Sequence, residues 1–150
     1  MTINVYTDGA CSNNQNKTLS KAGMGIYFGK GDPRNLSKRV EGKQTNNVAE
    51  LSAIKEVYFI LSDSILKGEK ICIYTDSNYS LLCLGSYGER MEKEGWKKNF
   101  ANKELVKEVY EMYKGKENVI FNHVKAHTLS KDPHSIGNEH ADRLAVESIS

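Results

Sequence analysis

Ile71-Cys72-Ile73-Tyr74-Thr75-Asp76-Ser77 is the segment from which the architecture of this chain can be inferred. Its apolar part is typical of a short strand that is buried on both faces of a sheet, as parallel strands are when helices cover them. The Asp76-Ser77 pair that follows is typical of a helix cap. The segment therefore predicts an α/β fold in which Asp76 lies at the carboxyl end of a strand.

Three further strands are predicted upstream of this segment. Residues 2–6 alternate between apolar and polar side chains and end at Asp8-Gly9, which is a turn signal. Residues 22–28 form an apolar run whose glycines indicate close backbone approach, and residues 35–42 show a weaker strand pattern. We expect these three strands to pair as antiparallel hairpins.

An amphipathic helix is predicted to begin near Asn47, because apolar residues recur after it at steps of three and four. Thr45 and Asn46 are both suitable caps for this helix. The prediction places Glu50 in its first turns.

Beyond residue 77 the sequence predicts short helices, one longer helix and a last strand. Gly85, Gly88 and Gly95 are expected to break up the first part, whereas residues 102–113 resume a helical period. The last strand is predicted over residues 119–124.

A polar loop over residues 125–135 and a closing helix complete the chain. The order of elements predicts a mixed five-stranded sheet of an α/β fold, with the first three strands antiparallel and the later strands parallel. Helices are expected on both faces of this sheet.

The totals of the sequence exclude several classes of protein. At 150 residues the chain is expected to form a single domain over 1–150, large enough to fold without metal or disulfide staples. A net charge of +2 excludes a global polycation. Any binding to nucleic acid therefore has to come from local patches.

Cysteine usage and hydropathy bear on the compartment. Three cysteines, odd in number and without CxxC spacing, argue against a disulfide framework or a zinc knuckle. No charged and apolar leader precedes the first strand, and no apolar run approaches the roughly 18 residues that span a bilayer. We therefore expect a soluble monomer in the reducing cytoplasm, with no membrane partner.

Four acidic residues, Asp8, Glu50, Asp76 and Asp142, lie at the ends of different predicted elements. Taken singly, each has a structural explanation as a turn residue, a helix cap, a solvated helix residue or half of an exposed ion pair. In the predicted topology, however, the first and fourth strands are neighbours, so Asp8 and Asp76 emerge side by side. Two helices can each bring one more acid over that edge.

Clustered carboxylates indicate a metal site. Two carboxylates about 5 Å apart repel by roughly 3 kcal/mol at an effective dielectric constant near 20, which is a liability unless a cation is bound. Oxygen ligands suit Mg²⁺ or Mn²⁺ better than zinc. Two such ions can activate a water and stabilise the departing oxygen in the hydrolysis of a phosphodiester.

The strings around the four acids resemble the type 1 ribonuclease H family, and the resemblance covers nearly the whole chain. The matching strings are Tyr6-Thr7-Asp8-Gly9-Ala10-Cys11, Thr45-Asn46-Asn47-Val48-Ala49-Glu50-Leu51, Ile73-Tyr74-Thr75-Asp76-Ser77 and Gly137-Asn138-Glu139-His140-Ala141-Asp142-Arg143-Leu144-Ala145. The resemblance implies a ribonuclease H fold and an endonuclease that cuts the RNA strand of an RNA/DNA hybrid, leaving 5′-phosphate and 3′-hydroxyl ends.

The resemblance also implies a cofactor and a role for each acid. Two Mg²⁺ ions are expected per site with substrate, and Mn²⁺ is a possible substitute. Asp8 corresponds to the residue that bridges both ions, Glu50 and Asp76 to those on the leaving-group side, and Asp142 to the one on the nucleophile side.

A loop histidine that assists proton handling or product release is a further feature of the family. Val124-Lys125-Ala126-His127 is similar to its usual setting, so His127 is our candidate. His134 is the competitor, because the loop here is a few residues longer than in many relatives and places His134 nearer Asp142.

Substrate contacts are implied by the same resemblance. Residues that match those reading the 2′-hydroxyl of RNA are Gly9, Cys11, Asn14, Asn46, Asn47 and Asn78. The pocket for a phosphate of the DNA strand matches Lys43, Thr45 and Asn102. The region after Asp76 resembles the family's handle, in which Tyr87 and Trp96 would lie against the DNA strand. Asn46 and Asn47 also suit helix capping, and Trp96 suits core packing equally well.

Two other classes of function are compatible with parts of this pattern. The same fold occurs in nucleases of DNA junctions and in domains excised from reverse transcriptases, but the Asn46-Asn47 pair disfavours the first and a complete fold from Met1 disfavours the second. A hybrid-binding module without activity is expected to have lost at least one carboxylate, whereas all four are present.

Overall fold

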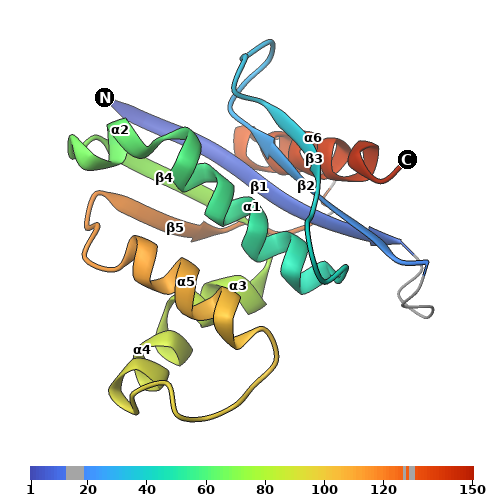
Figure 1. Cartoon of the computed structure of the whole chain (residues 1–150). Helices are drawn as coiled ribbons and strands as arrows, with labels where there is room; N and C mark the ends of the chain where they lie inside the picture. Colours follow the sequence, from blue (N-terminus) through green and yellow to red (C-terminus); the bar gives the residue numbers. More distant parts are fainter. Residues whose placement is uncertain (13–18, 127, 129–130) are drawn as a thin grey trace.

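The computed structural model describes residues 1–12, 19–126, 128 and 131–150. Within these residues the strands are β1 (Thr2–Ser12), β2 (Lys21–Tyr27), β3 (Leu36–Arg39), β4 (Lys70–Thr75) and β5 (Val119–His123). The helices described there are α1 (Asn46–Ile60), α2 (Ser62–Leu66), α3 (Asn78–Leu84), α4 (Ser86–Lys93), α5 (Lys103–Tyr113) and α6 (Pro133–Ser148) (Figure 1). None of these helices is both long and apolar enough to cross a membrane.

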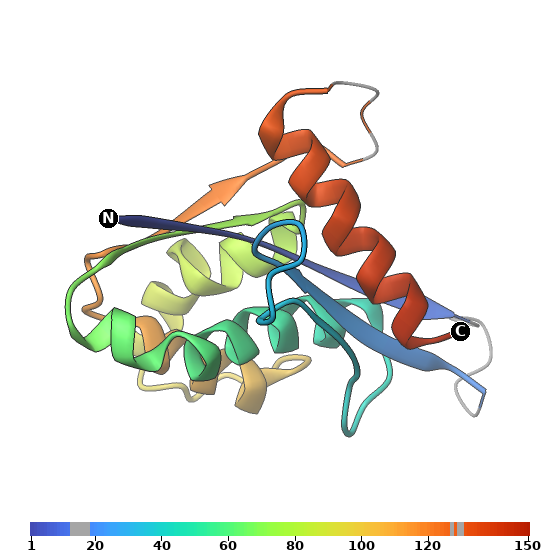
Figure 2. The same cartoon turned by 90° about the horizontal axis from the view of Figure 1, so that it is seen from above.

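The strands form one mixed sheet in the order β3-β2-β1-β4-β5. β1 pairs with β2, and β2 with β3, in antiparallel fashion, whereas β4 is parallel to both β1 and β5. Helix α6 packs on one face of the sheet and the other helices lie on the opposite side (Figure 2). The predicted five-stranded sheet, with helices on both faces, is confirmed.

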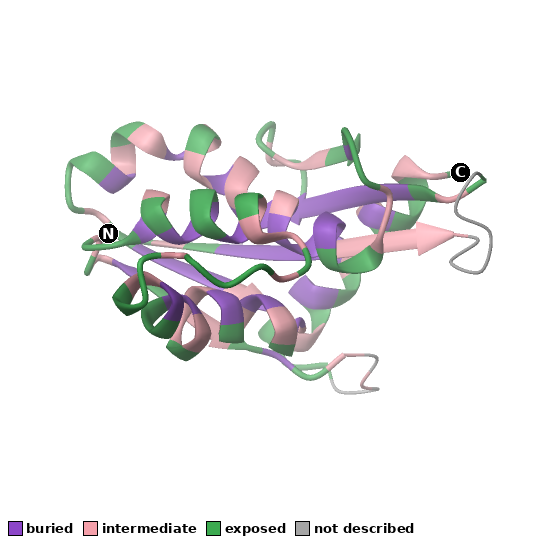
Figure 3. Cartoon of the chain, turned by 60° about the horizontal axis from the view of Figure 1, so that its bottom comes forward, coloured by how far each residue is buried: buried purple, intermediate pink, exposed green. Residues whose placement is uncertain are grey.

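Strand β4 has the double-sided burial that its sequence predicts. Ile71, Cys72 and Ile73 are 0 %, 8 % and 0 % exposed, although neighbouring side chains point to opposite faces. Fully buried residues such as Ile26 of β2 and Ile54 of α1 fill the space between the sheet and α1. Figure 3 shows buried residues along the central strands. Each such side chain contributes roughly 1.5–3 kcal/mol through burial, so this core fixes how α1 lies on the sheet.

The expected turn at Asp8-Gly9 is wrong, because β1 continues to Ser12. Asp8 pairs with Gly25, and Gly9 with Met24, in the ladder with β2. Gly9 serves a different purpose, since a Cβ there would lie 2.6 Å from the backbone nitrogen of Glu50. Glycine at this position is required for the close approach of α1 to β1 rather than for a turn.

The expectation that Gly88 interrupts a helix is also wrong. Gly88 lies inside α4 and is buried, where a Cβ would come within 2.4 Å of both the Cys83 carbonyl oxygen and the Tyr110 ring. Gly85 and Gly95, in contrast, follow the ends of α3 and α4 as predicted. The missing side chain of Gly88 lets α4 pack tightly, and packing outweighs its low helix propensity.

The last helix, α6, begins at Pro133, so the loop before it ends earlier than the predicted residue 135. Asp132 caps α6 by accepting hydrogen bonds from the backbone nitrogens of His134 and Ser135, and Pro133 occupies the first turn. His134 is therefore a helix residue rather than a loop residue.

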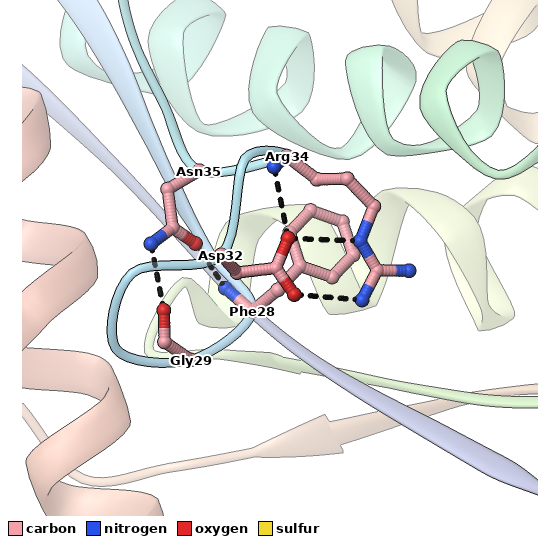
Figure 4. Close-up of polar contacts among 5 residues, drawn as sticks. All are labelled: Phe28, Gly29, Asp32, Arg34 and Asn35. Atoms are coloured by element: carbon pink, nitrogen blue, oxygen red, sulfur yellow. Dashed lines mark hydrogen bonds and ion pairs between the residues drawn. The ribbon is translucent and has the colours of Figure 1, made fainter.

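A compact turn connects β2 to β3 at the end of the sheet beyond Tyr6 (Figure 4). Asn35 accepts a hydrogen bond from the Phe28 backbone nitrogen at 2.7 Å and donates one to the Gly29 carbonyl oxygen at 2.7 Å. Arg34 donates two hydrogen bonds to the Asp32 carboxylate and lies over the Phe28 ring. These contacts close the hairpin and set β3 against β2.

Candidate active site

The four predicted acids line one cleft at the carboxyl ends of β4 and the adjoining part of β1. Thr7 of β1 pairs with Thr75 of β4, so the residues that follow them, Asp8 and Asp76, emerge side by side. Oxygen atoms of Asp8, Glu50 and Asp76 all lie within 4.8 Å of one another. The structure thus brings together three acids from a strand, a helix and a strand end.

Glu50 reaches this cluster from the opposite face of the sheet to α6. Thr45 caps α1 by accepting a hydrogen bond from the Val48 backbone nitrogen, which starts the helix beside the cleft. The close approach at Gly9 then lays the first turns of α1 on β1. As a result Glu50 is only 6 % exposed, which is unusual for a charged residue on a helix.

Asp142 joins the cluster from the other side. It lies on α6, lines the same cleft, and adds to the causes that raise the pKa of Asp8.

Burial and repulsion distort the acid–base behaviour of the cluster. The pKa of Asp8 is raised well above its usual range, first by burial and then by the charges of Glu50 and Asp76. The pKa of Glu50 is raised as well, by burial and by the charge of Asp76. Clustered carboxylates whose pKa values are raised in this way are the condition that a divalent cation relieves.

The donor set fits a hard divalent cation. Every ligand in the cluster is a carboxylate oxygen, which is the type that Mg²⁺ and Mn²⁺ prefer. The buried Glu50 Oε1 has no hydrogen-bond partner among the described residues. An acceptor in this position costs free energy unless a ligand or cation satisfies it.

Asp76 was expected to share helix capping with Ser77, but Ser77 alone caps α3. Ser77 Oγ accepts a hydrogen bond from the Ser80 backbone nitrogen at 3.0 Å, and Thr75 Oγ1 accepts one from the Ser77 backbone nitrogen at 3.1 Å. These buried hydroxyls hold the turn between β4 and α3. The Asp76 carboxylate is left to face the cleft.

Most of the residues expected to read RNA line the cleft with the acids. Those that do so are Gly9, Cys11, Asn46, Asn47 and Asn78. Asn46 and Asn47 are exposed at the start of α1, and neither is its cap, because Thr45 has that role. Asn14 and His127 lie outside the described residues.

The expected phosphate pocket is assembled from distant parts of the chain. Lys43 Nζ donates a hydrogen bond to Asn102 Oδ1 at 3.4 Å, although 59 positions separate them. Asn102 Nδ2 in turn donates to Tyr79 Oη at 3.1 Å, and Asn102 has left-handed backbone geometry with φ at 64°. Thr45 lies nearby in sequence, but its hydroxyl already serves α1.

Tyr87 and Trp96 pack in an aromatic cluster with Phe100 and Tyr110, outside the lining of the cleft. Trp96 lies against Phe100 and Tyr110, and Tyr87 against Phe100 in an edge-on arrangement. Trp96 also packs on the small core around Leu51. These contacts agree with the interpretation of Trp96 as a core-packing residue.

His134 is held by structural contacts on the α6 face of the sheet. Its ring stacks on Tyr74 with centroids 4.3 Å apart, and its Nδ1 lies 2.9 Å from Tyr6 Oη. Burial raises the pKa of Tyr6 to about 12, so the phenol remains protonated and able to donate. This cluster has a signal in the sequence, since Tyr6 and Tyr74 occupy equivalent places in two strands that the topology predicts to be neighbours.

Comparisons with known proteins place this arrangement in a family. The RNase H family model matches residues 1–150. Mouse Ribonuclease H1 is 36 % identical over 148 residues, covering 95 % of this chain and 48 % of the mouse protein. Ribonuclease H of Ruthia magnifica is 32 % identical over 149 residues, covering 95 % of this chain and 92 % of the bacterial protein.

Solved structures agree at the level of the fold. The RNase H domain of PFV superposes with a TM-score of 0.73 at 22 % identity, covering 98 % of this chain and 93 % of that domain. The chain spans about half the length of the mammalian relatives that it matches. The family model and the two relatives confirm what the acidic motifs predicted: the chain belongs to the RNase H family.

Proposed function

We propose that this protein is an endonuclease that hydrolyses the RNA strand of RNA/DNA hybrids in a reaction that depends on divalent cations. The observation that carries the proposal is the convergence of Asp8, Glu50 and Asp76 within 4.8 Å, with a buried Glu50 oxygen that lacks a partner among the described residues. Membership of the RNase H family supports the choice of substrate.

Each acid has a role in this proposal. Asp8 interacts with each of the other acids and would serve both cations. Glu50 and Asp76 would hold the cation on the leaving-group side, and Asp142 the one on the nucleophile side. Two Mg²⁺ ions, or Mn²⁺ in their place, would supply water activation and neutralise the charge that develops on the departing oxygen. The products would carry 5′-phosphate and 3′-hydroxyl ends.

Recognition of the hybrid uses two surfaces beside the acids. Asn46 and Asn47 are exposed at the rim of the cleft, where short amides can sense the 2′-hydroxyls of the RNA strand in a shallow minor groove. Lys43 and Asn102 are in contact outside the lining of the cleft, where an ammonium group and an amide can hold a phosphate of the DNA strand. The two surfaces together require one strand of each kind.

Proton handling is assigned to His127 in this proposal. His134 is committed to Tyr6 and Tyr74, and this supports His127 as the histidine that serves the reaction. We also propose that residues 1–150 act as one catalytic domain and as a monomer.

Cleavage of a strand-labelled RNA/DNA hybrid tests the function directly. Parallel reactions contain Mg²⁺, Mn²⁺ or a chelator, and matched RNA/RNA and DNA/DNA duplexes serve as controls. Metal-dependent cutting of the RNA strand of the hybrid alone is the expected result. Binding of the hybrid without cutting under both metals would instead identify a binding module, and cutting of DNA/DNA would identify a nuclease of another class.

A further inference from the structure

The side chain of Gln44 uses its whole hydrogen-bonding capacity, although it lies outside the acidic cluster. Its Oε1 accepts from the Ala22 backbone nitrogen at 2.8 Å and from Arg39 Nη2 at 3.0 Å. Its Nε2 donates to the carbonyl oxygens of Val40 at 2.8 Å and Gly42 at 2.9 Å. A primary amide has two donors and an acceptor oxygen with two lone pairs, so all four places are filled.

These bonds tie the segment between β3 and α1, residues 40–45, to the sheet (Figure 1). The pairing of β2 with β3 ends near Gly23 and Arg39, and the Val40 backbone nitrogen still donates to the Ala22 carbonyl oxygen. The Ala22 backbone nitrogen donates to Gln44 Oε1, and this hydrogen bond takes the place of a backbone hydrogen bond between β2 and β3. On the other side of the segment, Cys11 Sγ donates to the Gln44 carbonyl oxygen at 3.5 Å.

The residues on either side of Gln44 in the sequence belong to, or lead into, the two proposed contact surfaces. Lys43, immediately before Gln44, reaches Asn102 in the proposed phosphate pocket. Thr45, immediately after it, caps α1 and so sets where Asn46 and Asn47 stand at the cleft. A single amide thus fixes the chain between the residues proposed to hold the DNA strand and those proposed to read the RNA strand.

We propose that Gln44 is a positioning residue for the substrate, which sets the spacing between Lys43 and the Asn46-Asn47 pair by locking residues 40–45 onto the end of β2. The inference rests on the proposed function, because the substrate in question is the hybrid. Gln44 itself makes no contact with the acids, so its loss should weaken binding and leave the chemical step nearly intact.

Gln44→Met tests this, since it keeps the length of the side chain and removes all four bonds. Asn35→Leu is the matched control, because Asn35 ties the other end of β2 through the Phe28 backbone nitrogen and the Gly29 carbonyl oxygen, away from the cleft (Figure 4). Steady-state kinetics on a hybrid at several salt concentrations, together with melting temperatures, are measured for both variants and the parent protein.

Gln44→Met is expected to raise KM about five-fold or more, with kcat changed by less than about two-fold. The slope of log KM against log salt should become shallower by about one, because the Lys43 contact with a phosphate is lost. Asn35→Leu should lower the melting temperature by about as much as Gln44→Met does. It should change neither KM nor the slope of log KM against log salt. Gln44→Glu, which keeps one acceptor oxygen but loses both donors and turns its second oxygen toward the Val40 and Gly42 carbonyl oxygens, should also raise KM.

Two results would overturn the inference. One is an unchanged KM and salt slope in Gln44→Met while the parent protein cuts the hybrid. The other is an equal rise of KM in Asn35→Leu, which would assign the effect to general loss of stability. Failure of the parent protein to cut or bind the hybrid would refute the proposed function instead, and that outcome is read from the parent alone.

Discussion

At the scale of single residues, the acidic cluster shows how burial turns ordinary side chains into a site. Asp8 and Glu50 are 4 % and 6 % exposed. The pKa of each is raised by burial and by the charges of neighbouring acids. Their identities were predicted from the sequence by the strings that surround them. Their distances follow from the contact between β1, β4 and α1, which no local string specifies.

Asp76→Asn is expected to abolish turnover, with a loss of about 10³-fold or more, because one oxygen ligand becomes a neutral amide. The metal-free variant should fold as well as the parent or better, by up to about 1 kcal/mol, since a charge that repels Glu50 and Asp8 is removed. Hybrid cleavage with Mg²⁺ and thermal unfolding with chelator measure the two effects. Glu117→Gln, on an exposed acid at the amino end of β5, is the control and should change neither. Turnover at the parent rate would remove Asp76 from the site.

His134→Ala should destabilise the protein by about 1–2 kcal/mol, because it removes a ring stacked on Tyr74 and a hydrogen bond with Tyr6. His127→Ala should instead slow turnover, by less than the loss of a carboxylate does, with little effect on stability. Denaturant unfolding and kcat are compared for the two variants. A larger drop in kcat for His134→Ala than for His127→Ala would reverse the assignment of the two histidines.

At the scale of elements, periodicity and caps predicted most of the boundaries. Helix α1, β4, α5 and β5 all lie close to where the sequence places them, and Thr45 is the cap of α1 out of the two candidates, Thr45 and Asn46. The errors at Gly9 and Gly88 have a common cause. Glycine was interpreted through its own conformational freedom, whereas both glycines are required by a neighbouring element that comes too close for a Cβ.

Gly9→Ala should cost about 1–3 kcal/mol of stability and also lower kcat, because the new Cβ pushes α1 and hence Glu50 away from Asp8. Gly88→Ala is the matched control, since its Cβ would meet equally close atoms between α4 and α5, away from the cleft. Unfolding free energies and kcat with Mg²⁺ are measured for both. Equal kcat values at equal loss of stability would show that the spacing of α1 is not what Gly9 secures.

At the scale of the whole molecule, the cluster couples folding to protons and cations. The pKa values of Asp8 and Glu50 are raised in the folded state, so above pH of about 4 the folded chain holds more protons than the unfolded chain. Stability from this source is fully present below the unfolded pKa values and is lost as pH rises through the folded ones. A bound divalent cation takes the place of those protons.

In the presence of chelator, the free energy of unfolding should therefore fall between about pH 5 and pH 8, by up to about 1.4 kcal/mol per pH unit for each group. Added Mg²⁺ should raise the melting temperature, and more so at higher pH. Thermal unfolding at three pH values with and without Mg²⁺ measures both trends. Glu50→Gln should make the free energy of unfolding depend less steeply on pH. A parent protein whose stability rises over this pH range, with the same pH dependence in Glu50→Gln, would contradict the linkage.

Local patterns in the sequence are sufficient to predict the type and order of most elements, the family and the identity of the acids, because periodicity, caps and short strings are local properties of the chain. Tertiary structure alone decided that β1 runs on through Asp8, that His134 is bound by two tyrosines, and that Gln44 holds residues 40–45 to β2. These features depend on contacts between residues far apart in the chain. Their free energies come from neighbours that only folding brings within a few Å.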